Sequence, residues 1–372
     1  MTREQLDLDR RPILVFWELT RACLLACRHC RASAIPEPLP GQLSTEDGER
    51  FLESLTGFGR PYPVLVLTGG DMLMRADLPR LAKRARELRL PVAISPSVTP
   101  LLEPAALAVL RRAGVKVASL SLDGASAETH EGLRGVAGHF SQTLDALRLL
   151  REHGFTVQVN TVVRPENVEE LPEIAKLVKE AGASIWEVFF LVRVGRGAQL
   201  AELTPDQNED VCHFLVDASR YGFIVRTVEA PFFRRVVAWR QEGRDCETGP
   251  LYCRLADRLR ELLGEPLGVP RAQTKGTRDG KGIVFVSHDG DVYPAGFLPL
   301  AIGTVPEQDL VTLYRESPLL HDIRAARFGG RCGACEYADL CGGSRARAYA
   351  TSGDPLGEDP ACPYVPAVSR AR

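Results

Sequence analysis

The sequence predicts an α/β protein built on a partial (βα)6 barrel, followed by a small C-terminal module that contains clustered cysteines. Three observations lead to this fold class. Short apolar segments alternate with amphipathic segments from about residue 13 to residue 228. Glycine, proline and arginine are then enriched between residues 264 and 282, which is typical of a linker or loop. Seven of the ten cysteines lie in two groups, one near each end of the chain.

Six segments are expected to be strands, because each is short, rich in aliphatic or aromatic residues, and bounded by turn residues. They are residues 13–19, 64–67, 92–95, 115–122, 156–163 and 185–194. A helical segment follows each strand, so the sheet should be parallel with right-handed crossovers. Six units are fewer than the eight of a closed barrel, which favours an open, curved sheet. Ligands of such sheets bind at the carboxyl ends of the strands.

The helices are predicted from capping residues and from apolar side chains at three- and four-residue spacing. The first begins at Ser44, whose side chain can cap it, with the acid Asp47 three residues later. Further helices are expected at residues 77–88, 103–113, 140–153, 168–181, 206–221, 232–240 and 255–263. Gly154 and Gly182 follow two of these segments and are expected to end them.

The remaining signals set the domain boundaries. Residues 224–228 can add an edge strand, and residues 283–287 and 291–293 flank Asp289-Gly290, a hairpin signal. We therefore divide the chain into four parts. These are an N-terminal extension (1–12), the barrel (13–230), a helical linker and loop (231–282), and a C-terminal module (283–372).

Composition narrows the class of protein. The net charge of −2 argues against a nucleic-acid binder that relies on a basic surface. No apolar run approaches the ~20 residues that a membrane span requires, and the first residues lack the apolar core of a signal peptide. We expect a cytoplasmic protein that binds neither nucleic acid nor membrane. Stable disulfides are rare in that compartment, so clustered cysteines point to metal binding or catalysis.

Cys23, Cys27 and Cys30 form a C-x3-C-x2-C motif directly after the first strand. Three thiolates within eight residues can hold one face of an iron–sulfur cube and leave one iron open to another ligand. A structural zinc site is the alternative, but it usually has a fourth Cys or His nearby. His29 lies between two of the cysteines and is expected to point away from a shared metal.

Residues 18–30, ELTRACLLACRHC, resemble the signature of radical S-adenosylmethionine (SAM) enzymes. In that family three cysteines hold a [4Fe–4S] cluster whose open iron binds the amino and carboxylate groups of SAM. One electron cleaves SAM to methionine and a 5′-deoxyadenosyl radical, which abstracts a hydrogen from the substrate. The resemblance implies that Cys23, Cys27 and Cys30 are the catalytic cluster ligands. It also implies a partial (βα)6 barrel, in agreement with the six predicted units.

Further motifs extend the resemblance toward SAM. Thr68-Gly69-Gly70-Asp71 is similar to the family's GGE-type loop, with Asp in place of the usual Glu; the alternative is a plain Gly-Gly turn. Residues 121–124, SLDG, and the pair Arg134-Gly135 match elements near the SAM carboxylate, and an arginine fork suits that anion. Asn160 matches a position that reaches the SAM ribose. By resemblance the SAM-binding residues are Gly69, Gly70, Asp71, Ser121, Asp123, Arg134 and Asn160.

Cys332, Cys335 and Cys341 form C-x2-C-x5-C, with Cys362 as a distant fourth cysteine. Four thiolates can complete an iron–sulfur cluster or a zinc site. Residues 330–348 and 353–363 resemble the auxiliary-cluster module, of SPASM or twitch type, found in radical SAM enzymes. Two departures are Ser344, where haem-forming relatives usually have Cys-Gly-Gly-Cys, and Ala295 after Pro294, where full SPASM domains have a cysteine. We therefore expect one auxiliary [4Fe–4S] cluster.

The three other cysteines are expected to be structural. Cys212 lies in an apolar helical pattern and should be a small core residue. Cys246 and Cys253 flank Thr248-Gly249-Pro250 and could also be extra ligands or substrate-contacting thiols.

The resemblance covers about residues 12–365 and is greatest to the branch that modifies tetrapyrrole propionates in haem or haem d1 synthesis. It implies hydrogen abstraction from a propionate β-carbon, then loss of CO2 and an electron, which the auxiliary cluster would accept. A flavodoxin- or ferredoxin-type protein would be the reductant. Candidate cations for the propionates are Arg193, Arg196, Arg234 and Arg235, and the basic loop 271–281 could cover the site.

Two alternatives remain. The same modules occur in enzymes that form thioether or carbon–carbon crosslinks in ribosomal peptides. Those enzymes often have an N-terminal winged-helix domain, for which the ~12 residues before the first strand leave no room. A non-catalytic iron–sulfur electron carrier is the other alternative, and the open-iron motif argues against it.

Overall fold

The computed structural model describes residues 7–244, 246–272 and 276–367. Ten strands in these ranges form one sheet in the order β10-β9-β8-β1-β2-β3-β4-β5-β6-β7. The strands are β1 Leu14–Glu18, β2 Val64–Thr68, β3 Val92–Ile94, β4 Val117–Ser121, β5 Thr156–Val163, β6 Ile185–Phe190, β7 Ile224–Val228, β8 Ile283–Val286, β9 Asp291–Tyr293 and β10 Gly303–Thr304.

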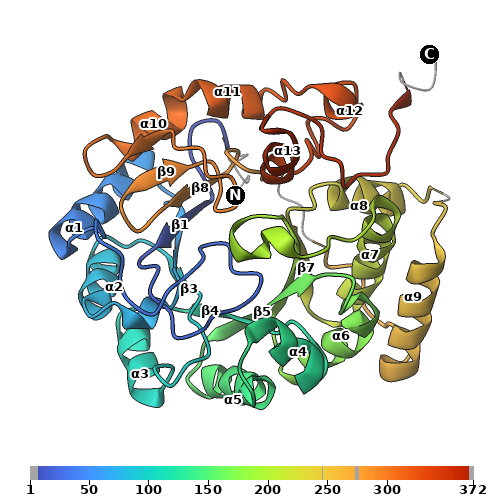
Figure 1. Cartoon of the computed structure of the whole chain (residues 1–372), viewed down its shortest axis with the longest axis horizontal. Coiled ribbons are helices and arrows are strands. Elements are labelled where there is room, and N and C mark those ends of the chain that lie inside the picture. Colours follow the sequence, from blue (N-terminus) through green and yellow to red (C-terminus); the bar gives the residue numbers. More distant parts are fainter. Residues whose placement is uncertain (1–6, 245, 273–275, 368–372) are drawn as a thin grey trace.

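Helices cover the outside of this sheet (Figure 1). The α-helices in the described ranges are α1 Thr45–Ser54, α2 Leu78–Glu87, α3 Pro104–Arg112, α4 Ala127–Arg134, α5 His139–Glu152, α6 Leu171–Glu180, α7 Pro205–Ala218, α8 Phe233–Gln241, α9 Pro250–Leu263, α10 Leu310–Glu316, α11 Pro318–Arg324, α12 Gly330–Gly333 and α13 Arg345–Ser352. The 3-10 helices are η1 Leu55–Phe58, η2 Met72–Met74, η3 Val168–Glu170, η4 Gly195–Gln199 and η5 Ser219–Tyr221.

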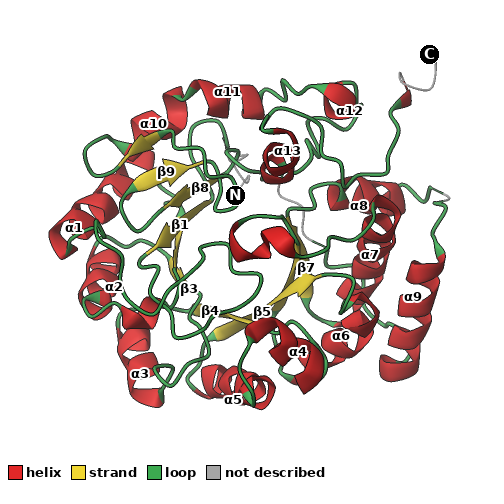
Figure 2. Cartoon of the chain, in the orientation of Figure 1, coloured by secondary structure: helices red, strands yellow, loops and turns green. Residues whose placement is uncertain are grey.

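Strands β1 to β7 are all parallel, which confirms the predicted partial barrel of six βα units and the added edge strand at residues 224–228. The predicted sixth strand is too long. Strand β6 ends at Phe190 rather than at residue 194, because the chain turns there and the Val194 N–H bonds to the carbonyl of Val192 (2.8 Å). The strands curve around a centre that loops cross (Figure 2).

Side chains alternate along the strands in a way that separates the core from the centre of the barrel. In β5 and β6 every second residue is buried and those between are half-buried, apart from the exposed Thr156 at the start of β5. Trp186, which is fully buried, packs against Phe214 of α7 and Phe223, so the buried set faces the helices. The half-buried set, which includes Asn160 and Glu187, therefore faces the centre of the barrel.

The C-terminal segment joins the barrel sheet directly. The predicted hairpin is present as β8 and β9, and β8 pairs in parallel with β1. The sequence Ile-Val-Phe-Val of β8 is buried along most of its length, as expected for an inner parallel strand. The four domain boundaries stay a prediction, and the strands assigned to the C-terminal module are part of the same sheet as the barrel.

Helix α4 was absent from the sequence prediction. Ser126 caps it by accepting a hydrogen bond from the Thr129 N–H, and Gly135 ends it with φ 74°, so the usual start and stop signals are present. This helix places Arg134 at its last turn. Among the described helices, none has both the length and the apolarity needed to cross a bilayer.

Candidate active site

The N-terminal cysteines lie on a loop that leaves the carboxyl end of β1 and closes on itself. The Cys23 N–H bonds to the Ile35 carbonyl (2.8 Å), and the Ile35 N–H bonds to the Arg21 carbonyl (3.2 Å). Arg196 holds the loop from outside, with Nε on the carbonyl of Cys27 (2.9 Å) and Nη1 on that of Ala34 (2.7 Å). The loop is thereby fixed over the barrel edge where ligands bind.

Each of the three sulfur atoms accepts a hydrogen bond from a nitrogen. The donors are the Leu25 N–H to Cys23 Sγ (3.3 Å), the Ala34 N–H to Cys30 Sγ (3.4 Å) and Arg134 Nη1 to Cys27 Sγ (3.6 Å). Donors of this kind stabilise a thiolate and the metal it binds. Burial raises the pKa of the Cys23 thiol, so a bound metal would have to keep this sulfur ionised. The donor set fits an iron–sulfur cluster.

The predicted Gly69-Gly70 loop packs backbone to backbone against the cysteine loop. The Gly70 N–H bonds to the Thr20 carbonyl and the Asp71 N–H to the Ala22 carbonyl, both at 2.7 Å. A Cβ on Gly69 would lie 2.6 Å from the Thr20 oxygen, and one on Gly70 would overlap the Ala22 carbonyl. The two glycines are therefore required for this contact, whatever they also do for a ligand.

Asp71 is fully buried. Its carboxylate accepts hydrogen bonds from Thr99 Oγ1 (2.7 Å) and from the Leu73 N–H (3.1 Å), which caps η2. Burial raises the pKa of Asp71. These contacts use the Asp71 carboxylate to hold the loop together. The predicted contact of Asp71 with SAM would therefore involve its backbone.

Arg134 and Asp123 form a buried ion pair behind the cysteine loop. Asp123 also accepts a hydrogen bond from the Val162 N–H (2.8 Å). Burial is the largest single influence on Asp123 and raises its pKa, but the Arg134 guanidinium, the neighbouring histidines and the Val162 N–H together lower this pKa to about 2. Arg134 thus joins a fixed carboxylate to Cys27 Sγ. Its Nε is buried and has no partner within the described residues, which leaves one donor for an anionic ligand such as the SAM carboxylate.

A chain of two buried histidines supports this ion pair from the other side. The Asp123 N–H donates to His130 Nδ1 (3.1 Å), and His130 Nε2 lies 2.8 Å from His139 Nδ1. His130 Nε2 must then carry the proton, and His139 Nε2 donates to the Val98 carbonyl (3.1 Å). Burial lowers the pKa of His130 to about 3 and also lowers that of His139, so both rings are neutral near pH 7.

Ser121 and Asn160 lie side by side at the centre of the barrel. They are paired in register across β4 and β5, and the same row continues through Glu187 of β6 to Arg226 of β7. Gln158 Nε2 bonds to Asn160 Oδ1 (2.8 Å) and to Glu187 Oε2 (3.0 Å). Burial raises the pKa of Glu187. Sequence reasoning did not identify Glu187 or Arg226; only the strand alternation could have indicated them.

The four C-terminal cysteines surround a single hollow. Its lining includes Cys332, Cys335, Cys341 and Cys362, together with Arg235, Tyr337 and Asp359. Across the described residues no group of three His, Cys, Asp or Glu side chains is arranged around a single metal ion. Thiols spaced around a hollow fit a polynuclear cluster. Backbone N–H groups again point at sulfur, from Tyr337 to Cys335, from Gly343 to Cys341 and from Asp359 to Cys332, each at 3.4 Å.

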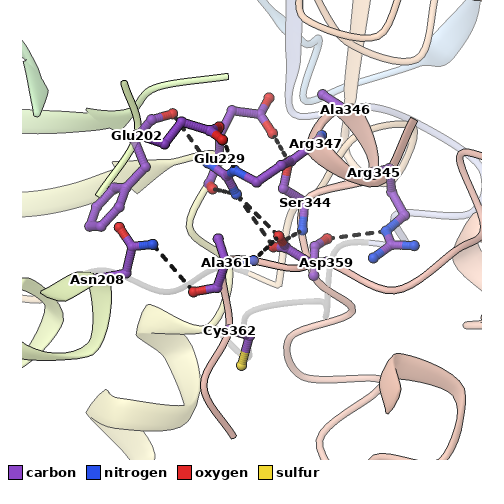
Figure 3. A network of polar contacts seen from close by, with 12 residues as sticks. Glu202, Asn208, Glu229, Ser344, Arg345, Ala346, Arg347, Asp359, Ala361 and Cys362 are labelled. Carbon is purple, nitrogen blue, oxygen red and sulfur yellow. Dashed lines mark hydrogen bonds and ion pairs between the residues drawn. The ribbon is translucent and has the colours of Figure 1, made fainter. Parts of the chain in front are cut away.

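A buried polar network attaches this second site to the barrel (Figure 3). Arg347 of α13 pairs with Asp359 (3.3 Å) and with Glu202 (3.2 Å), and it donates to the Leu191 carbonyl after β6 (3.0 Å). Ser344 donates to Glu229, and burial raises the pKa of Glu229 to about 8. Ser344 also caps α13. Where haem-forming relatives usually have a cysteine, this chain has a structural hydroxyl.

The remaining candidate residues, three cysteines and four arginines, differ in burial and in contacts. Cys212 is fully buried in the core of α7, as predicted, whereas Cys246 is half-buried and Cys253 exposed. Of the four arginines predicted as candidate cations for the propionates, Arg196 holds the cysteine loop and Arg235 forms a bidentate pair with Glu209 (2.6 and 2.7 Å).

The other two candidate cations, Arg193 and Arg234, each have a side-chain hydrogen bond to a backbone carbonyl. Arg193 is exposed and donates to the Ala198 carbonyl (3.0 Å), and Arg234 donates to the Leu340 carbonyl (3.3 Å). Part of the basic loop, residues 273–275, lies outside the described residues. Arg278 from that loop is buried rather than placed over the barrel mouth.

Comparison with known proteins identifies the family. Residues 17–178 match the Radical SAM superfamily. An AdoMet-dependent heme synthase of Oleidesulfovibrio alaskensis is 36 % identical over 95 % of this chain and 87 % of that protein. The chain belongs to the radical SAM superfamily. Radical SAM enzymes use a [4Fe–4S] cluster and SAM, so this protein is an enzyme with those cofactors.

This radical SAM enzyme is also similar in sequence to two further proteins and in fold to two solved structures. A pre-heme d1 synthase of Dinoroseobacter shibae is 31 % identical over 95 % of the chain and 86 % of that protein. A mycofactocin maturase MftC of Mycobacterium tuberculosis is 30 % identical, with coverages of 97 % and 86 %. Streptococcus suis SuiB bound to S-adenosylmethionine has a TM-score of 0.66 at 16 % identity, covering 95 % of this chain and 78 % of SuiB. The structure titled native anSMEcpe with bound AdoMet has a TM-score of 0.65 at 18 % identity, covering 94 % of both chains.

We predict that Gly70→Ala prevents assembly of the N-terminal cluster, because the added Cβ overlaps the Ala22 carbonyl and displaces the cysteine loop. Iron content after anaerobic reconstitution should fall by about four atoms per chain. Gly132→Ala is the matched control, since Gly132 lies inside α4 with no atom near its Cβ position. Unchanged iron in the Gly70 variant would contradict the required contact.

We also predict strong coupling between Asp123 and Arg134. Asp123→Asn leaves a buried guanidinium without its counter-charge, which should reduce the free energy of unfolding by about 3–5 kcal/mol. The double variant Asp123→Asn/Arg134→Met should lose clearly less than the sum of the two single losses. Anaerobic chemical denaturation of the reconstituted enzyme measures all three. If the losses in free energy of unfolding are additive, Asp123 and Arg134 are not energetically coupled.

Proposed function

We propose that this radical SAM enzyme acts on the propionate side chains of a tetrapyrrole, by oxidative decarboxylation as in haem formation or by side-chain removal as in haem d1 formation. The observation that carries the proposal is the similarity to an AdoMet-dependent heme synthase and a pre-heme d1 synthase over 95 % of the chain. Both relatives are 31 % or more identical to this chain.

An apolar, aromatic surface near the end of β6 supports a flat macrocyclic substrate. Phe189, which faces the barrel centre, lies 6.4 Å from the ring of Phe297. Phe297 and Tyr349 are half-buried and pack against one apolar cluster that includes Val192 and Ala346. Partly exposed aromatic faces of this kind stack well on planar π systems. This surface lies where the barrel meets the C-terminal segment.

The protein groups around the cofactors have distinct roles in the proposal. Cys23, Cys27 and Cys30 hold the cluster, and the free Nε of Arg134 binds the SAM carboxylate, while Asn160 contacts the ribose. When bound, the cluster and SAM supply hydrogen-atom abstraction. Asp123 and the two histidines keep Arg134 in place. Arg134 then contacts both the cysteine loop and the SAM carboxylate from one fixed position.

We further propose that Cys332, Cys335, Cys341 and Cys362 hold one auxiliary [4Fe–4S] cluster. The hollow lined by all four thiols supports a single site, and the sequence resemblance to auxiliary-cluster modules favours iron–sulfur over zinc there. A flavodoxin- or ferredoxin-type protein is proposed as reductant. A cytoplasmic location is supported by the ten cysteines, all of which are free thiols in the structure, as a reducing compartment would keep them.

The second candidate function is maturation of a ribosomal peptide by thioether or carbon–carbon crosslinking. The mycofactocin maturase, at 30 % identity, favours it. Its identity to this chain is lower than that of the heme synthase, so the tetrapyrrole remains the first candidate.

The test combines anaerobically reconstituted enzyme, SAM, a strong reductant and iron-coproporphyrin. We expect 5′-deoxyadenosine together with a porphyrin that has lost CO2 and a pair of hydrogens for each propionate converted to a vinyl group. Cys27→Ala should abolish both products, whereas the exposed Cys253→Ala should not. Deoxyadenosine with an unchanged porphyrin would refute the tetrapyrrole and favour the peptide. No deoxyadenosine from iron-loaded enzyme would contradict the radical SAM assignment.

The aromatic surface yields a separate prediction. Phe297→Ala should lower kcat/KM for the porphyrin about two- to tenfold, since a stacking contact contributes about 0.5–1.5 kcal/mol. Phe297→Tyr keeps the ring and should keep most of the activity. Formation of 5′-deoxyadenosine without substrate should be equal in all three proteins. If Phe297→Ala leaves kcat/KM unchanged, the macrocycle does not bind on this surface.

A further inference from the structure

Three arginine side chains lie close to the C-terminal thiols or to the glycines beside them. Arg345 Nη2 lies 3.7 Å from Cys332 Sγ, and Arg235 Nη2 lies 3.8 Å from Cys362 Sγ. Arg278 carries its guanidinium against Gly342, next to Cys341. At the N-terminal site one guanidinium, that of Arg134, donates to a thiol.

Two glycines after Cys341 make room for these side chains. Gly342 and Gly343 have φ of 74° and 63°, in the left-handed region that favours glycine. A Cβ on Gly342 would overlap Arg278 Nη1, and one on Gly343 would lie 2.5 Å from Arg345 Nη2 and 3.0 Å from Cys332 Sγ. The Cys-Gly-Gly sequence therefore allows two guanidinium groups to approach the thiols.

One aromatic ring holds both guanidinium groups. The ring of Phe328 lies 4.3 Å from Arg345 Cζ and 5.2 Å from Arg278 Cζ. Arg345 is fully buried and Arg278 is 4 % exposed. Phe328 thus fixes two buried cations beside the thiols by cation–π contact.

The charges of these two arginines are not cancelled by a bonded carboxylate in the described part of the chain. Arg345 donates to the carbonyls of Gly343 (3.2 Å) and Pro355 (3.1 Å), and Arg278 donates to that of Ala338 (2.8 Å). The buried Asp279 accepts instead from the backbone N–H of Arg345 (3.1 Å). By contrast, Arg235 is paired with Glu209, and Arg134 with Asp123.

We propose that Arg278 and Arg345 raise the reduction potential of the cluster held by Cys332, Cys335, Cys341 and Cys362 above that of the N-terminal cluster. Reduction adds a negative charge to a cluster that its four thiolates already make anionic, and buried cations nearby stabilise the reduced form. Hydrogen bonds to the ligating sulfur act in the same direction. The inference rests on the proposed auxiliary cluster and does not depend on the substrate.

The test is an EPR-monitored redox titration of the reconstituted enzyme, in which the N-terminal cluster serves as internal reference. In Arg278→Gln the ratio of reduced to oxidised auxiliary cluster, at a fixed poised potential, should fall about tenfold, the effect of removing one nearby charge in a partly polar interior. The N-terminal cluster should titrate as in the wild type. Arg278→Lys keeps the charge and should keep most of the ratio.

Two further variants serve as a control and as an independent test. Arg327→Gln is the matched control, because Arg327 is exposed, precedes Phe328 and pairs with Asp322; it should change neither cluster. Phe328→Leu removes the ring and should lower the ratio in the same direction as Arg278→Gln, which covers the case in which the arginine variant does not fold.

An unchanged ratio in both Arg278→Gln and Phe328→Leu would overturn the inference, as would an equal fall in Arg278→Lys. Wild-type protein with about four irons and no second EPR signal would also overturn it, by removing the auxiliary cluster itself. Failure of the porphyrin assay would refute the proposed substrate and leave this redox result standing.

Discussion

The contact on which the site depends is the backbone pairing between the loop after β2 and the cysteine loop after β1. Two N–H groups, of Gly70 and Asp71, bond to the carbonyls of Thr20 and Ala22, and the glycines leave no Cβ in the way. This pairing fixes the three thiols over the carboxyl edge of the sheet. Asp71 is then buried beneath it, and Arg134 can reach Cys27 from the far side of the barrel.

The two thiol sites differ in electrostatics although they share a ligand type. At the N-terminal site the Cys27 sulfur accepts a hydrogen bond from the Arg134 guanidinium, whose charge is balanced by a buried carboxylate with a pKa near 2. The C-terminal sulfurs line one hollow beside buried arginines bonded to neutral carbonyls. Because β8 pairs directly with β1 and Arg347 bonds to the carbonyl after β6, both sites belong to one continuous framework. Their separate environments suit separate redox roles on that framework.

Much of the fold could be predicted from local patterns, and the parts that could not depend on long-range contacts. Strands 156–163 and 224–228 were predicted with the observed bounds, since alternation and turn residues are encoded locally. The pairing of β8 with β1 joins residues about 270 apart, and no local signal encodes it. The cysteine motifs predicted which residues are the candidate ligands. The acidic partners of Arg134 and Arg235 could not be predicted, because these pairs form only when the folded chain buries both side chains. The contacts of Arg196 with the cysteine loop could not be predicted for the same reason, because its Nε and Nη1 donate to carbonyls of a segment far away in the sequence.

The central claim is that Cys23, Cys27 and Cys30 alone hold the cluster that binds SAM. The most direct test removes the other four ligands in a Cys332→Ala/Cys335→Ala/Cys341→Ala/Cys362→Ala variant and records the EPR spectrum of the reduced protein with and without SAM. We predict about four irons per chain and a spectrum that changes when SAM is added. A retained cluster whose spectrum is the same with and without SAM would contradict the claim.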